Sequence, residues 1–168
     1  LRMSRGLGDV YKRQHPCFSC PVHGEADKGG YGYDMHMNGN VICRDFDVES
    51  GLALNSESEL KLENGFAAFT KDFFDNGAYV IENNQTHEVS LRDPEGKNYL
   101  NVYFPEAPLF GLWSAEKKNA PYAAVEPWFG RCDKEDFNGS LEEREWGHVL
   151  AQGACFQAAY TIEIAGED

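Results

Sequence analysis

Residues 156–164 read Phe-Gln-Ala-Ala-Tyr-Thr-Ile-Glu-Ile, and this stretch decides the fold class. One face of it would carry Phe156, Ala158, Tyr160, Ile162 and Ile164, and the other would carry Gln157, Ala159, Thr161 and Glu163. A period of two is typical of an antiparallel β-strand with one buried face. The stretch therefore predicts a half-buried strand.

The same alternation recurs upstream in shorter runs, at residues 51–54, 59–62, 78–82, 87–92, 99–104, 109–114 and 122–126. Turn residues separate the runs, as in the segment 93–96 (Asp-Pro-Glu-Gly), which favours a tight hairpin. Two short helical turns are predicted at 65–74 and 140–145, the second because Ser140 and Glu143 have capping-box spacing. Many short strands without a long helical stripe predict an all-β fold, an antiparallel β-sandwich.

Composition limits the partners. The chain has 168 residues, with 28 Asp and Glu against 15 Lys and Arg, for a formal net charge of −13. So acidic a surface repels phosphate backbones and anionic lipid headgroups, and no apolar run approaches the ~20 residues that span a bilayer. We therefore predict neither nucleic acid nor membrane as a partner. The five cysteines form an odd set with no regular framework, which favours a reducing compartment and predicts a cytoplasmic location.

The first fourteen residues differ from the rest. They read LRMSRGLGDVYKRQ and hold four of the fifteen basic residues but one acid. The string DVYKRQ matches the in-frame translation of GATGTGTATAAGAGACAG, which resembles a sequencing-library adapter. We predict that residues 1–14 are a translated artefact outside the fold, that the natural chain begins at or near His15, and that residues 15–168 form a single partial domain.

Two histidines flank a Cys-x-x-Cys pair in residues 15–23 (His-Pro-Cys-Phe-Ser-Cys-Pro-Val-His). His15, Cys17, Cys20 and His23 could in principle supply four zinc ligands. Prolines stiffen the backbone around the pair, and the chain has no second Cys-x-x-Cys. We therefore favour small side chains packed in an extended segment, and predict no metal and no cofactor.

A glutamate ends the apolar run in residues 124–133 (Ala-Val-Glu-Pro-Trp-Phe-Gly-Arg-Cys-Asp). We expect Pro127 to stop the strand there. A carboxylate walled by Trp128 is partly desolvated, which raises its pKa toward the range of a general base. The same residue types also suit an exposed glutamate at a strand terminus.

Three segments together resemble one family. Residues 15–21 resemble the His-Pro-x-Phe-Asn segment of aldose 1-epimerases, also called galactose mutarotases. Residues 124–130 are similar to the Glu-Pro-Trp-x-Gly segment of the bacterial branch, and residues 110–114 (Phe-Gly-Leu-Trp-Ser) look like the Gly-Ile-Trp-Ser strand that precedes it. The segments follow the family's order, and the likeness covers residues 15–164.

The resemblance implies a galactose mutarotase-like supersandwich of which this chain is the C-terminal portion, with an aldohexose on one face. It implies that His15 is the general acid and Glu126 the general base of ring opening, and that no cofactor takes part. Trp113, Trp128 and Asp75 are the expected sugar-binding residues. The family's sugar-binding Asp aligns with Gly77, so Asp75 is a shifted candidate, and Ser19 stands where the family has Asn.

The pair carries a geometric expectation. His15 and Glu126 should open onto the same face, several ångströms apart without touching, with Trp113 or Trp128 forming the wall. Three alternatives stay open at this point. They are a non-catalytic carbohydrate-binding sandwich that stacks a sugar on the two tryptophans, a glycosidase using Glu126 and Asp133, and a sugar-phosphate mutarotase with an Arg or Lys cluster.

Overall fold

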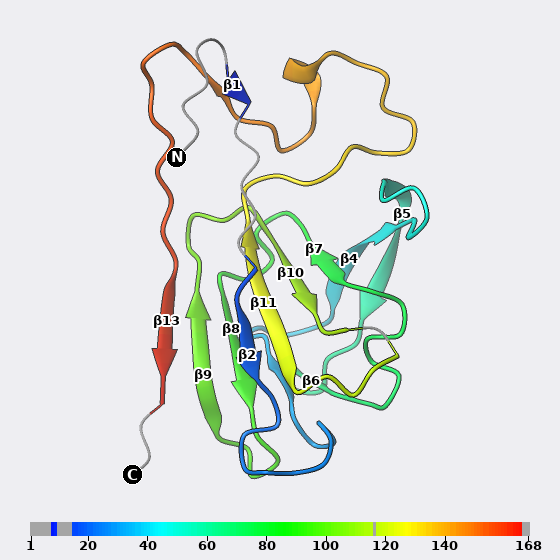
Figure 1. Cartoon of the computed structure of the whole chain (residues 1–168), viewed down its shortest axis with the longest axis vertical. Coiled ribbons are helices and arrows are strands. Elements are labelled where there is room, and N and C mark those ends of the chain that lie inside the picture. Colours follow the sequence, from blue (N-terminus) through cyan, green and yellow to red (C-terminus); the bar gives the residue numbers. More distant parts are fainter. Residues whose placement is uncertain (1–7, 10–14, 116, 166–168) are drawn as a thin grey trace.

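The computed structural model describes residues 8–9, 15–115 and 117–165. Two antiparallel β-sheets face each other in a sandwich, which confirms the predicted fold class (Figure 1). The six-stranded sheet has the order β2 (Cys17–Ser19), β11 (Tyr122–Trp128), β10 (Leu109–Trp113), β7 (Tyr79–Ile81), β4 (Val41–Phe46) and β5 (Ala53–Leu60). The five-stranded sheet has the order β13 (Thr161–Ile164), β9 (Asn98–Tyr103), β8 (Glu88–Arg92), β3 (Gly32–Asp34) and β6 (Phe66–Ala68).

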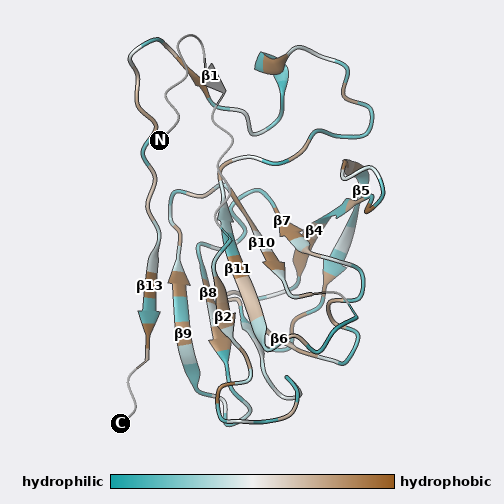
Figure 2. Ribbon diagram, viewed as in Figure 1, coloured by the Kyte–Doolittle hydropathy of each residue, from teal (hydrophilic) through white to brown (hydrophobic). Residues whose placement is uncertain are grey.

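The hydrophobic core lies between the sheets, where alternate residues of each strand meet. Val125, Leu112 and Ile81 contribute from the six-stranded sheet, and Leu91 and Val102 from the five-stranded sheet, all fully buried. Burying each such side chain contributes about 1.5–3 kcal/mol. Figure 2 shows β10 as one of the most hydrophobic strands, whereas the edge strand β5 is largely white and teal.

The other face of the six-stranded sheet carries the site described below. Arg44, Val80, Gly111 and Glu126 lie opposite one another across β4, β7, β10 and β11. Directly paired residues share a face, and their sequence neighbours point into the core. This outer face of the sheet therefore presents one row of side chains that ends at Glu126.

Five predicted strands are confirmed, as β7 to β11, and so is the hairpin turn between β8 and β9. In that turn the N–H of Gly96 donates to the carbonyl of Asp93 at 3.1 Å, and Gly96 has a φ of +88°. The helical turn predicted at 140–145 is a 3-10 helix, η1 (Leu141–Glu143). Its Glu143 carboxylate accepts the backbone N–H of Ser140 at 2.7 Å.

The predicted C-terminal strand is shorter and more exposed than expected. Only Thr161–Ile164 pairs, and Ile162 and Ile164 are 41% and 75% exposed. Both stand opposite buried residues of β9, Val102 and Leu100, so they do lie on the core side of their sheet. They stay exposed because β13 is the outermost strand (Figure 1), where the facing sheet does not cover them.

Three other expectations are wrong. The two predicted runs 51–54 and 59–62 belong to one strand, β5. The middle of β5 is polar and exposed, which is possible because β5 is at the edge of its sheet. Segment 65–74 holds β6 and turns instead of a helix, since β6 pairs with β3. Pro127 does not stop β11, which runs to Trp128. The pairing between β2 and β11 stops at Ala124. Beyond Ala124, β11 is paired with β10 alone and is locally an edge strand, where a proline is tolerated.

Of the segment 1–14, the structure describes two residues. They form β1 (Gly8–Asp9), which pairs with β12 (Val149–Leu150) outside both sheets. The other residues of the predicted artefact lie outside the described residues. That the segment 1–14 is not part of the fold therefore stays a prediction. Among the residues described, no helix has the length and apolar character to cross a membrane.

Candidate active site

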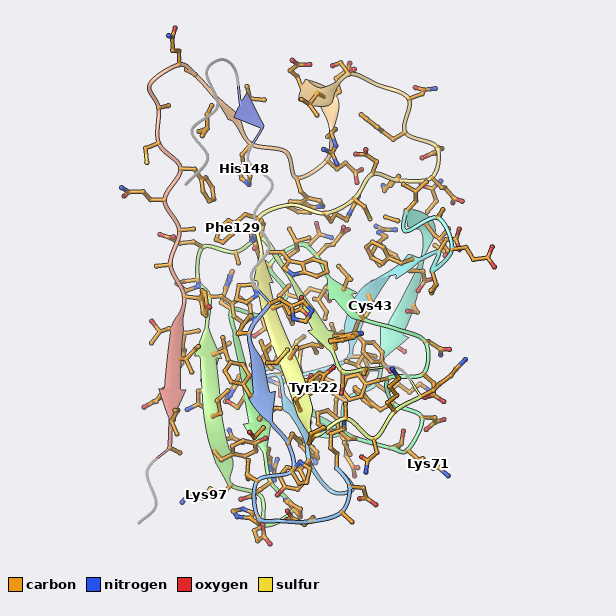
Figure 3. The ribbon with its side chains drawn as sticks, in the orientation of Figure 1. Cys43, Lys71, Lys97, Tyr122, Phe129 and His148 are labelled. Carbon is orange, nitrogen blue, oxygen red and sulfur yellow. The ribbon has the colours of Figure 1, made fainter. Side chains whose placement is uncertain are left out.

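Strands β2, β10 and β11 bring the residues of two separate motifs together on the outer face. Cys17 of β2 stands opposite Ala124 of β11, and Trp113 of β10 stands opposite the same alanine. His15, just before β2, therefore reaches Glu126 across the strand. Figure 3 labels Tyr122 on β11, whose ring lies 5.8 Å from that of Trp113.

The imidazole and the carboxylate are in direct contact. Nε2 of His15 lies 3.4 Å from Oε1 of Glu126, and the two side chains are 55% and 5% exposed. The ring of His15 also meets the ring of Trp113 edge-on, with centroids 5.2 Å apart. The expected common face is thus observed, whereas the expected gap is not. The contact gives the buried carboxylate a polar partner, and such a partner lowers the cost of burying it.

Trp128 holds the other oxygen of the same carboxylate. Its Nε1 atom donates to Oε2 of Glu126 at 3.3 Å. The ring lies over Gly111, where an added Cβ would come within 2.8 Å of Cζ2. A glycine at this position therefore gives the indole room beside the carboxylate.

Cys17 is a site residue that the sequence analysis did not assign to this site. Its Sγ atom lies 3.5 Å from Nδ1 of His15. Partial burial, and then the negative charge of Glu126, raise the pKa of this thiol. The alternation along β2 could have indicated that His15, Cys17 and Ser19 share a face.

The four candidate zinc ligands do not meet. Cys20 is fully buried in the core, whereas Cys17 is exposed beside His15. His23 turns away toward the carboxylate of Asp93, at 3.5 Å. The physical reason is the odd spacing of Cys17 and Cys20, which sends their side chains to opposite faces of an extended segment.

A network of charged groups borders the outer face at its far end. Glu82 is 5% exposed and is bonded to Arg131, which is 2% exposed, and to Nε of Arg44 at 3.3 Å. Trp146 donates from Nε1 to the same Glu82 carboxylate at 3.2 Å, and it packs on the cluster that includes Trp128. The members of this network are scattered over residues 44–146 with no local spacing to link them, so the sequence does not predict it.

The two remaining candidate carboxylates lie elsewhere. Asp75 lines a cavity of about 780 Å³ together with Lys28 and Phe74, and no described contact joins it to His15 or Glu126. Asp133 accepts a hydrogen bond from Nε of Arg144 at 2.6 Å. The carboxylate that the glycosidase alternative needs as its second catalytic group is therefore engaged in an ion pair. The described contacts of Asp133 do not include Glu126.

Solved structures decide the architecture. A galactose mutarotase related enzyme from Lactobacillus acidophilus superposes with a TM-score of 0.82 and 27% identity over 97% of this chain. The chain has a galactose mutarotase-like fold. A galactose mutarotase-like protein from Lactobacillus casei matches with a TM-score of 0.80 at 20% identity, over 95% of the chain.

Sequence comparison finds distant homologues. The chromosomal and plasmid LacX proteins of Lactococcus lactis subsp. lactis are each 28% identical over 139 residues, or 77% of this chain. No family model matches the chain. The galactose mutarotase-like chain spans about half the length of its relatives, 44% of each LacX protein and 54% of each solved structure.

Proposed function

We propose that this chain carries the acid and base residues of an aldose 1-epimerase that interconverts the α and β anomers of a neutral aldohexose. The observation that carries the proposal is the contact between His15 and Glu126, which are far apart in sequence and adjacent on the outer face. Relatedness to galactose mutarotase-like proteins supports it. The sugar is the proposed ligand.

The chemistry follows from the two side chains. Glu126 takes the proton from the anomeric hydroxyl while His15 gives a proton to the ring oxygen, and the bond between C1 and that oxygen breaks. The open aldehyde rotates about C1–C2. On reclosure His15 recovers its proton and Glu126 returns its own, so no atom or electron is gained or lost. An imidazole and a carboxylate are residue types that commonly act as general acid and general base.

The surroundings suit an uncharged sugar. Trp113 offers apolar ring surface beside His15, as pyranose sites require. Trp128, the other tryptophan expected to bind sugar, is 6% exposed and packs in a buried cluster, so it contacts Glu126 rather than offering a free ring face. The arginines that border this face, Arg44 and Arg131, are both bonded to Glu82. A phosphate would have to compete with that carboxylate for them, so we favour a neutral hexose over a sugar phosphate.

Polarimetry tests the proposal on the full-length product of the gene. Freshly dissolved α-D-glucose or α-D-galactose should equilibrate faster with the protein than without it. Glu126→Gln should lower kcat about 100-fold or more, the size expected for loss of a general base, while sugar affinity changes little. Glu59→Gln, on the exposed part of β5, is the matched control.

The outcomes separate the alternatives. Sugar binding without any acceleration would support the non-catalytic carbohydrate-binding function. Near-normal turnover of Glu126→Gln would refute the assignment of the base. We also propose the cytoplasm as the location, supported by the odd number of cysteines.

A further inference from the structure

His23 leaves the candidate active site and meets two carboxylates instead. It lies in the loop between β2 and β3, whereas Asp93 and Glu95 lie in the turn between β8 and β9. One ligand atom from each of the three lies within 4.8 Å of the other two. Figure 3 shows the two loops together at the lower end of the molecule, where Lys97 is labelled.

The two loops are held against each other by their own packing. Gly30, in the first loop, has a φ of +84°, and a Cβ added to it would lie 3.2 Å from Cβ of Pro94. The backbone N–H of His23 donates to Glu25 at 3.0 Å, which fixes the loop on the other side. The three side chains therefore converge from a preformed backbone.

Asp93 has the features of a ligand held in place. Its side chain is 4% exposed. Oδ1 accepts the backbone N–H of Lys97 at 2.8 Å, which orients the carboxylate. The described contact of Oδ2 is with Nε2 of His23, at 3.5 Å. A buried carboxylate oxygen is thus directed at an imidazole nitrogen and into the cluster with Glu95.

We propose that His23, Asp93 and Glu95 bind a divalent transition-metal ion of the zinc class, which joins the β2–β3 loop to the β8–β9 turn. Two ligand atoms each 2.0–2.1 Å from a tetrahedral zinc ion lie about 3.4 Å apart, close to the observed separation of Nε2 and Oδ2. One imidazole with two carboxylates suits Zn²⁺ better than Mg²⁺, which prefers oxygen and water. The ion would be structural, because neither His15 nor Glu126 belongs to the cluster.

Isothermal titration with ZnCl₂ in a non-coordinating buffer tests this site. The full-length protein should bind one ion with saturation, and its melting temperature should rise with Zn²⁺. His23→Ala, Asp93→Asn and Glu95→Gln should each weaken Zn²⁺ binding at least about tenfold, the usual lower effect of disturbing a metal site. Asp93→Asn keeps an oxygen acceptor for the N–H of Lys97, so the turn is preserved.

Two controls isolate the cluster. His36→Ala removes another histidine beside a carboxylate, since Nε2 of His36 lies 3.4 Å from Glu88. Cys17→Ser removes the exposed thiol beside His15. Both should leave Zn²⁺ affinity unchanged, and Mg²⁺ should bind far more weakly than Zn²⁺. Saturable binding that survives His23→Ala, binding lost in Cys17→Ser, or no saturable binding would each overturn the proposal.

Discussion

The indole of Trp128 donates a hydrogen bond to the carboxylate of Glu126, with 3.3 Å between Nε1 and Oε2. The two residues are 6% and 4% exposed, so this bond lies away from solvent. It leaves the other carboxylate oxygen, Oε1, beside His15. Trp128 therefore orients the proposed base from a buried position.

Trp128→Phe should test the orienting role. Phenylalanine keeps most of the apolar packing but removes the N–H donor. A hydrogen bond to a charged group contributes about 1.5–3 kcal/mol, so we expect kcat for anomer interconversion to fall about tenfold or more. The KM should change little. Trp113→Phe, which alters a ring in contact with His15, should instead change KM more than kcat. An unchanged kcat in Trp128→Phe would contradict the orienting role.

Gly111→Ala should displace the indole from its place beside Glu126. The new Cβ would lie 2.8 Å from Cζ2 of Trp128, which is too close for a real contact. Overpacking of this kind destabilises by about 1–3 kcal/mol, measurable as a lower urea midpoint. The double variant with Trp128→Phe is the control. Phenylalanine lacks the Cζ2 atom, so the double variant should be less unstable than the two single effects added together.

The residues of the site that could be predicted from the sequence are those that belong to short local motifs. His15 and Glu126 each belong to a short motif, and they do share a face of one sheet. The strands β7 to β11 were predictable because each is a short, largely apolar run bounded by turn residues, although β8, β10 and β11 prove to be buried on both faces. The separation of the two side chains was not, because a rotamer depends on neighbours that the sequence does not place.

What sequence analysis missed depends on pairing between distant strands. Arg44, Glu82 and Arg131 form one network only because β4 lies beside β7 and the chain after β11 returns to it. The exposure of Ile164 follows from the position of β13 at the sheet edge, which alternation alone cannot reveal. Likewise, His23 meets Asp93 through two loops far apart in the sequence.

Cys17 should react slowly with alkylating agents although it is exposed. Burial and the charge of Glu126 raise the pKa of its thiol, so less of it is the reactive thiolate at a given pH. Glu126→Gln removes the charge and should speed alkylation by iodoacetamide at pH 8. Peptide mass spectrometry measures the rate at Cys17, with the exposed Cys155 as the internal control. Equal rates at Cys17 in the two proteins would show that Glu126 does not influence the thiol.

Cys43 should make the protein lose stability at alkaline pH. It is labelled in Figure 3 and is 2% exposed, and burial raises the pKa of its thiol from about 9 to about 12. Between these values the unfolded chain has released the thiol proton while the folded chain keeps it. The contribution of this thiol to stability is therefore complete below pH 9 and is lost as pH rises toward 12. In that window it should lower the free energy of unfolding by about 1.4 kcal/mol per pH unit. Urea unfolding at several pH values measures this loss. The free energy of unfolding should fall less steeply with pH for Cys43→Ala than for the wild type. The cavity that the substitution leaves changes the stability at every pH but not this slope. Cys155→Ala removes an exposed thiol and should keep the wild-type slope, so equal slopes in the wild type and Cys43→Ala would exclude this effect of burial.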